Sequence, residues 1–300
     1  KHRYIFCAPV ILPPNSYLTR ADAVIAIIEA MCKSSSSYMR SKLVSYLLMY
    51  AAQQSAVDTV KSLLRAKASV HARDHEDNDA LTLAVMHGSA AAARALIQAK
   101  ANIEVRNDSA RTPLMCAAHA GHAECVRVLI DAKAKIQALD GDDMTSLMLA
   151  VEENHVSCVQ LLIEAQANVN ALEALDSTAL MQAAGKGHVA CAKILIDAKA
   201  DIHPTDVRGF NAFIRAAACG SVDCAELLLT ADADVTVETN RGETALMYSS
   251  KRGCSDLVQI LVDARANVDT KTRNGDTALI FAARDRQHDC LRILVDAKAY

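Results

Sequence analysis

Apolar residues recur along most of the chain as pairs of short helical patterns separated by a turn. In the stretch "TPLMCAAHAGHAECVRVLI", one apolar face is formed by Leu114, Ala117 and Ala118, and a second by Val126, Leu129 and Ile130. Such spacing predicts two amphipathic helices. Gly121 lies between them, where a turn requires a residue that tolerates positive φ. The small alanines favour close packing of the two helices.

This pattern repeats every 33 residues without a slip in register. Copies of "TPLMCAAHAGH" begin at Asp79, Thr112, Thr145, Thr178, Asn211, Thr244 and Thr277. One step earlier, "YLLMYAAQQSA" from Tyr46 is a degenerate copy that keeps two leucine or methionine positions and two alanines. The chain therefore contains eight consecutive units.

The period and the "TPLMCAA" signature resemble those of the ankyrin repeat, over residues 46–300. The resemblance implies an all-α solenoid of helix-turn-helix units with hairpin loops. It also implies a non-catalytic scaffold that binds another protein through a concave groove and its hairpin tips. One unit cannot bury its apolar face alone, so neighbours must stack, with helix axes roughly 8–10 Å apart.

The residues before the repeats divide into an extended segment, residues 1–15, and a helical cap, residues 16–45. The paired prolines in "APVILPPN" disfavour helix. Thr19 and Asp22 resemble a capping box for a helix over residues 20–32. "KSSSS" then predicts a flexible connector before a helix that starts near Ser41 and runs into the first repeat. Because the last unit is as apolar as the inner ones, we expect the chain to continue past Tyr300 or that end to be covered.

The composition restricts the fold class and the kinds of partner, but indicates no catalytic chemistry. Hydrophobic residues make up 52% of the chain, but aromatic residues only 4%, which fits thin alanine-rich layers. The formal net charge of -3 gives no overall attraction to nucleic acid. The apolar runs are shorter than the roughly 20 residues of a membrane span, and no signal peptide is visible. We expect a soluble, intracellular protein, in the cytoplasm or, if the N-terminus is processed, in an organelle matrix.

Five of the ten cysteines share one repeat position, on the second helix. They are Cys125, Cys158, Cys191, Cys224 and Cys290. Equivalent residues one repeat apart are too distant for disulfides, whose Cα atoms lie within about 7 Å. We therefore expect small buried hydrophobes in a reducing compartment.

The segment "CAAHAGHAEC" carries the side chains of a zinc site, but the repeat alignment spreads them over two helices. The potential ligands are Cys116, His119, His122 and Cys125. We expect no metal, no cofactor and no catalytic residues. His122, His155 and His188 are expected to bond backbone near the turn between the helices.

A basic residue recurs just after the second helix, where ankyrin repeats usually have glycine. The eight residues at this position are Lys67, Lys100, Lys133, Gln166, Lys199, Asp232, Arg265 and Lys298. A left-handed residue other than glycine costs roughly 1–2 kcal/mol, so we expect a slightly extended helix end. The alternative is that the stacked interfaces impose the left-handed conformation. A charged partner for this column is disfavoured, because acidic residues recur two positions upstream.

The exposed side of the first helices and the loop tips is expected to form a polarised binding groove. Its acidic half contains Asp142, Asp143, Glu152 and Glu153. Its basic half contains Arg208, Arg215, Arg241, Lys251, Arg252, Arg273 and Arg284, with Tyr248 and Phe281 as exposed aromatic anchors. The alternative is that these charged residues only form a solvated surface and bind no partner.

These observations favour a protein-protein interaction scaffold that binds neither nucleic acid nor membrane. Two other classes remain open: a structural subunit built permanently into a large assembly, and the regulatory ankyrin portion of a longer enzyme or channel. The sequence does not identify the partner, because ankyrin grooves carry specificity in variable residues.

Overall fold

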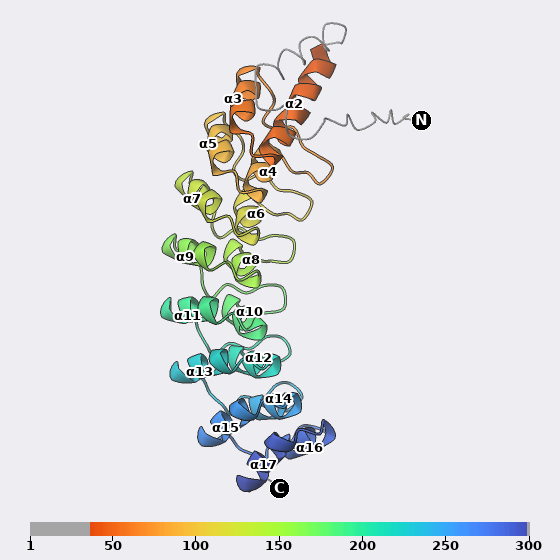
Figure 1. Ribbon diagram of the computed structural model, residues 1–300, viewed down its shortest axis with the longest axis vertical. Coiled ribbons are helices and arrows are strands. Elements are labelled where there is room, and N and C mark those ends of the chain that lie inside the picture. The colour runs from red at the N-terminus through yellow and green to blue at the C-terminus, as the bar shows by residue number, and fades with distance from the viewer. Residues whose placement is uncertain (1–36, 299–300) are drawn as a thin grey trace, which may run out of the picture. The chain divides into compact units, whose positions relative to one another are not determined.

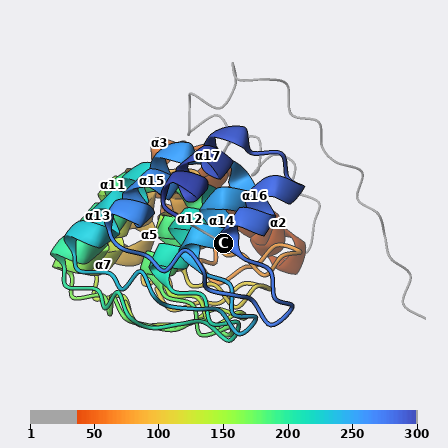
Figure 2. The same ribbon diagram turned by 90° about the horizontal axis from the view of Figure 1, so that it is seen from below.

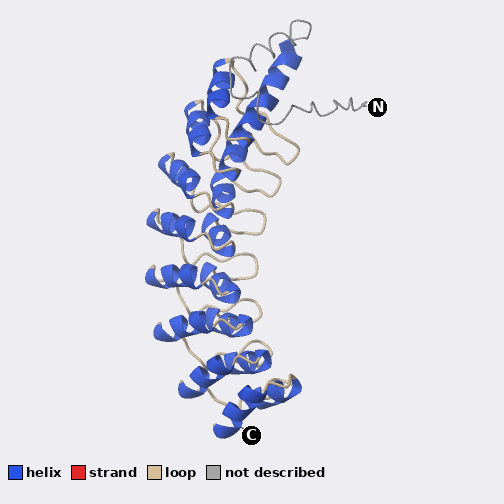
Figure 3. Ribbon diagram, viewed as in Figure 1, coloured by secondary structure: helices blue, strands red, loops and turns tan. Residues whose placement is uncertain are grey.

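The computed structural model describes residues 37–298, with side chains from Ser41 onward, and contains sixteen helices in that range (Figures 1 and 3). The extended segment and most of the predicted cap, including the helix expected over residues 20–32, lie outside the described residues. No helix of the described range is long and apolar enough to cross a bilayer. The chain divides into two compact units that meet between Asp108 and Ser109.

The described part of the first unit consists of two helix pairs. These are α2 (Ser37–Gln53) with α3 (Val57–Arg65), and α4 (Ala80–Met86) with α5 (Ala90–Gln98). Helix α2 is the helix predicted from about Ser41, which begins at Ser37 and continues through the degenerate repeat.

The second unit consists of six helix pairs. Its helices are α6 (Pro113–His119), α7 (Ala123–Asp131), α8 (Ser146–Glu152), α9 (Val156–Glu164), α10 (Ala179–Lys186), α11 (Val189–Asp197), α12 (Ala212–Cys219), α13 (Val222–Thr230), α14 (Ala245–Arg252), α15 (Ser255–Asp263), α16 (Ala278–Arg284) and α17 (His288–Asp296). The even-numbered helices form one row and the odd-numbered helices a second row. Seen along the stack, the loops of this unit lie together on one side (Figure 2).

From α4 to α16, each first helix begins at a side chain that caps its amide groups. The hydroxyl of Thr145 accepts a hydrogen bond from the amide of Met148 at 3.2 Å, and Thr178 does the same for Met181. Asn211 takes this role in α12. Capping residues of this type stabilise a helix by about 1 kcal/mol, so the capping residue, which is threonine in most units, sets where these helices start.

The first helices end at a left-handed residue, as the sequence predicts. Gly121 has φ 76° and Gly187 has φ 70°, while Asn154 takes φ 58° at the same repeat position. The N–H groups that follow bond back to the last turn, for example His122 to Ala117 at 3.0 Å. The chain thereby reverses direction and starts the second helix.

The expected extension of the second helices is wrong. Helix α7 ends at Asp131, and Lys133 adopts φ 67°. The Lys133 amide bonds to the Ile130 oxygen at 2.9 Å, and the Ala134 amide bonds to the Leu129 oxygen at 3.0 Å. This is a Schellman motif with lysine at the position that glycine usually occupies.

All eight basic or polar residues at this position are left-handed, with φ between 61° and 67°. Alanine follows each of them, and Ala134, Ala200 and Ala266 are buried. The repeated burial of this alanine fixes the path of the chain, which explains why the backbone accepts a strained residue.

The predicted cysteine column is a packed part of the core. Cys125, Cys158, Cys191, Cys224 and Cys290 are all buried, and the described cysteines are free thiols. Burial raises the pKa of the Cys158 and Cys191 thiols to about 11. They therefore stay protonated at neutral pH and act as small hydrophobic side chains.

Candidate functional site

The loop tips of the second unit are built by one polar residue per repeat. The Asp206 carboxylate accepts hydrogen bonds from the amides of Arg208 and Phe210, both at 2.8 Å. Asp140 and Thr272 close their own loops in the same way. Gly209 then takes φ 83° to complete the turn. The tips are thus rigid platforms that present the residues between these anchors.

Backbone hydrogen bonds join each tip of the second unit to the one before it. The Gly141 amide bonds to Ser109, Ala174 to Asp142, Val207 to Leu175, Asn240 to Arg208, and Arg273 to Arg241, with N···O distances of 2.9–3.4 Å. We call the residues from Gly141 to Arg273 that make these bonds the tip row. The amides that donate these bonds are already occupied, so the tip row offers mainly side chains to a partner.

Four hollows of the second unit lie on or beside α14, the first helix of its repeat. One of about 340 Å³ lies between the tips and is lined by Arg208, Phe210, Arg241 and Tyr248 among others. A second of about 350 Å³ lies one repeat further, against Phe281 and Arg284. The other two are lined by Tyr248 and Lys251. We call the shared lining, Arg241, Glu243, Tyr248, Lys251 and Phe281, the α14 surface.

A stack of rings and a guanidinium forms one wall of the α14 surface. The centroids of Phe210 and Tyr248 are 5.4 Å apart, with a 50° angle between the ring planes. The guanidinium carbon of Arg208 lies 5.0 Å from the Phe210 centroid. The Tyr248 hydroxyl donates to Glu243 at 2.6 Å. Burial and this carboxylate raise the pKa of Tyr248, so the ring remains neutral and fixed.

Phe281 and Tyr248 are less exposed than the sequence suggested. Phe281 is buried at 9% exposure, and Tyr248 is half-buried. The guanidinium of Arg284 covers the Phe281 ring at 5.7 Å, which explains the difference. Both rings nevertheless line hollows and so remain partly accessible to a partner.

Some of the expected basic residues are neutralised within the protein. Arg215 bonds to Asp206 at 2.6 Å, and Arg284 bonds to Asp276 at 2.9 Å. Burial opposes ionisation of Asp206, but the amides of Phe210 and Arg208 and the Arg215 guanidinium outweigh it and lower the pKa of the carboxyl.

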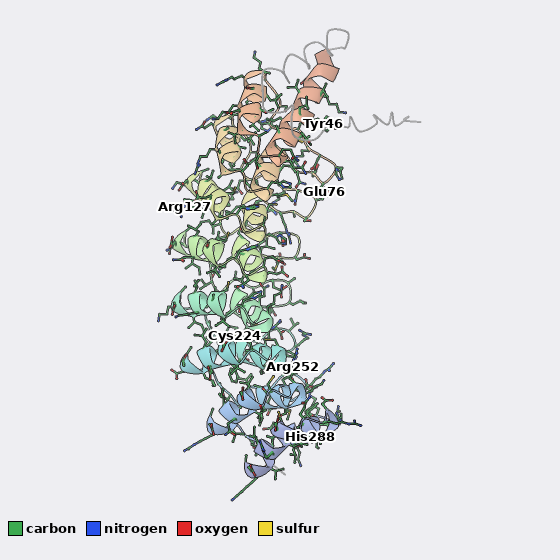
Figure 4. The ribbon with its side chains drawn as sticks, viewed as in Figure 1. Tyr46, Glu76, Arg127, Cys224, Arg252 and His288 are labelled. Atoms are coloured by element: carbon green, nitrogen blue, oxygen red, sulfur yellow. The ribbon has the colours of Figure 1, made fainter. Side chains whose placement is uncertain are left out.

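Arg208 also lies 3.8 Å from Asp206, whereas the remaining basic residues keep their charge available. Among the described residues, no carboxylate lies within 4.0 Å of the side-chain nitrogens of Arg241, Lys251 or Arg273. Arg252 is exposed at the end of α14, where Figure 4 labels it, and its Nε donates to the Ala218 oxygen at 2.6 Å. The unpaired cations therefore gather at the α14 surface and the adjoining tips.

The acidic residues lie further toward the start of the second unit. Asp142, Asp143 and Glu153 are exposed and form no ion pair within the described range. Glu152 bonds to Lys186 at 3.1 Å, and its backbone oxygen accepts from the same lysine at 3.1 Å. Within the described range, the acidic half of the predicted groove therefore forms no ion pair with its basic half.

His155 and His188 bond backbone of the preceding repeat, as expected. Nε2 of His155 lies 3.0 Å from the His119 oxygen, and Nε2 of His188 lies 3.3 Å from the Glu152 oxygen. They tie neighbouring repeats together. Within the described part of the chain, no group of three or more His, Cys, Asp or Glu side chains could hold a metal ion.

An exposed apolar set of tip residues was not predicted from the sequence. Leu172, Leu175 and Val207 belong to consecutive loops and are exposed. Nor did the sequence reveal the ring stack, because Phe210 and Tyr248 are 38 positions apart in the chain. The available signal was the repeat alignment, which places Leu175, Arg208 and Arg241 at one tip position.

Comparison with known families supports the fold described above. The model of the family described as ankyrin repeats (3 copies) matches residues 28–107, 48–140, 81–173, 147–239 and 213–300. Because these matches cover most of the chain, it belongs to the ankyrin-repeat family, whose members are scaffolds for protein interaction. A search of curated proteins finds no match.

Solved structures with this architecture include the ankyrin repeat domain of Bcl-3, described as a unique member of the IkappaB protein family. It is 28% identical to this chain, and the match covers 74% of this chain and 100% of that one, with a TM-score of 0.64. Since 544 chains match in all, the likeness supports a repeat scaffold without selecting a partner.

Proposed function

We propose that this protein is a non-catalytic, intracellular scaffold that binds another protein through its concave groove and hairpin tips, centred on the α14 surface. One observation carries the proposal: three hollows meet at Tyr248 and a fourth adjoins them at Arg241 and Phe281, so that aromatic rings lie beside unpaired cations. The structurally similar Bcl-3 domain supports the class of repeat scaffold, but not this particular site.

The physical case rests on how interfaces gain free energy. Aromatic and arginine side chains in well-packed pockets contribute most of the binding free energy at interfaces. The rings of Phe210 and Tyr248 are already held in place. These two side chains therefore lose little conformational entropy when a partner binds. Arg241, Lys251 and Arg273 add attraction for an acidic partner and raise its association rate.

The experiment is capture of partners from the native source by two variants that carry the same change in charge. Arg241→Glu/Lys251→Glu/Arg273→Glu alters the proposed site. Arg127→Glu/Lys193→Glu/Arg292→Glu alters three exposed residues on second helices, such as α7, where Figure 4 labels Arg127. Circular dichroism first verifies that both variants fold.

We expect the first variant to lose a partner that the second retains. A partner lost equally from both would reflect net charge alone. A partner retained by both would place the binding site elsewhere and overturn the proposal.

A further inference from the structure

The chemistry of the tip row changes in one direction along the second unit. Asp142 lies at its start with Asp143 next to it, Leu175 and Val207 follow, and Arg208, Arg241 and Arg273 complete it. The tip-to-tip hydrogen bonds make this order spatial as well as sequential, because each tip contacts the next. An acidic, an apolar and a basic region therefore follow one another along one surface.

The apolar region has no structural role that accounts for it. Leu175 is 57% exposed, Val207 50% and Leu172 48%, so these side chains add little to the core. Neighbouring exposed apolar side chains of this kind mark surfaces that another molecule covers. Polar residues occupy the tip position of Leu175 in the adjacent repeats, namely Asp142 and Arg208.

The basic region is only partly compensated, because Arg241 and Arg273 have no ion-pair partner among the described residues. The nearby carboxylates are engaged: Asp206 pairs with Arg215 at 2.6 Å and with Arg208 at 3.8 Å, Asp276 pairs with Arg284, and Glu243 accepts a hydrogen bond from the Tyr248 hydroxyl. At the opposite end, Asp142 and Asp143 are free of ion pairs among the described residues. The two ends thus attract opposite charges.

From this arrangement we infer that the tip row binds an extended protein segment of defined polarity. The segment carries a basic side chain toward Asp142 and Asp143, an apolar side chain on Leu175 and Val207, and acidic side chains toward Arg208, Arg241 and Arg273. This inference rests on the proposed function and specifies the chemistry of the partner.

The repeat distance sets the spacing within the segment. Successive repeats are roughly 8–10 Å apart, and an extended chain advances about 3.3 Å per residue. About three residues of the bound segment therefore span the distance from one tip to the next. The segment should present its basic, apolar and acidic residues at every third position.

The test is binding of synthetic peptides to the whole protein, measured by fluorescence anisotropy. The probe has lysine, then leucine, then three glutamates at every third position, separated by serine and alanine, and is made in both chain directions. The control has the same composition, with leucine moved to one end and lysine placed among the glutamates. We expect one direction of the probe to bind at least about tenfold more tightly than the control.

Two protein variants locate the peptide. Leu175→Ser/Val207→Ser should weaken binding by about tenfold while leaving its salt dependence unchanged. Arg241→Glu/Arg273→Glu should abolish binding of the glutamate probe and restore it for a probe with lysine in place of the last two glutamates. This charge-reversal rescue cannot arise from misfolding.

Equal binding of probe and control, or no rescue, would overturn the ordered segment. The proposed function has a separate outcome. The order of residues in the peptide could have no effect while Arg241→Glu/Lys251→Glu/Arg273→Glu still loses its cellular partner. The proposed binding site would then stand, and only the inferred chemistry of the segment would be wrong.

Discussion

Replacing Gly121 with alanine should destabilise the second unit more than the same change at Gly187. Both glycines end a first helix with positive φ, 76° and 70°. A left-handed alanine costs roughly 1–2 kcal/mol, and the reduced entropy of the unfolded chain offsets about 0.4–1 kcal/mol of that. The backbone term alone therefore predicts a loss of about 1 kcal/mol at either site.

The two positions differ in what the new methyl group meets. At Gly187 the nearest atoms belong to Ser221 at 3.5 Å, an ordinary contact. At Gly121 the His155 ring atoms Cε1 and Nδ1 would lie at 2.5 Å, so the ring must move. Moving it breaks the 3.0 Å hydrogen bond from His155 to the His119 oxygen. The broken bond and repacking add about 1–2 kcal/mol.

The assay is urea unfolding of the wild type, Gly121→Ala, Gly187→Ala, His155→Ala and the double variant Gly121→Ala/His155→Ala. We expect a loss of about 2–3 kcal/mol for Gly121→Ala and about 1 kcal/mol for Gly187→Ala. In the double variant the clash is absent, which predicts a coupling free energy of about 1–2 kcal/mol. Equal losses at the two glycines, or additive effects in the cycle, would refute the role of His155.

Three further changes test other parts of the structure by the same unfolding assay. Lys133→Gly relieves a left-handed lysine and should stabilise the protein by about 0.5 kcal/mol; a loss of stability would contradict the strain. Ser250→Ala removes a fully buried hydroxyl that has no hydrogen-bond partner, and should stabilise by about 1 kcal/mol. Asp206→Asn should cost about 1–2 kcal/mol at pH 7, because it removes the charge that bonds Arg215. Since the folded pKa of Asp206 is lowered, this difference should be complete above about pH 4 and should shrink as the pH falls further; a difference that grew in acid would exclude this assignment.

The sequence predicted the repeated elements well because each is fixed by local chemistry. Thr145 caps its helix through its own hydroxyl, and Gly121 turns the chain through its own backbone freedom. The cysteine column followed from the constant register of the repeat, and burial of Cys158 and Cys191 agrees with it.

The conformation of Lys133 was predicted wrongly because the prediction considered only the helix propensity and backbone strain of Lys133 itself. Its backbone is decided by the residue after it, Ala134, which is buried and fixes the path of the chain. Tertiary packing overrides the local preference there.

The candidate site was harder to predict because it depends on pairings between repeats. The sequence identified the groups of like charge, but not that Asp206 neutralises Arg215 or that Arg284 covers Phe281. It also could not distinguish the exposed Leu175 from a core leucine, since exposure of a loop residue depends on the neighbouring tips.

Site-specific photocrosslinking tests most directly whether a protein binds at the tips and the α14 surface. A photoreactive benzoylphenylalanine would replace Arg241 in one protein and Lys193, on the second helix α11, in another. Crosslinked proteins from the native source would then be identified by mass spectrometry. We expect a specific protein to crosslink at Arg241 and not at Lys193. Crosslinking at Lys193 alone, or equally at both positions, would contradict a partner site on this surface.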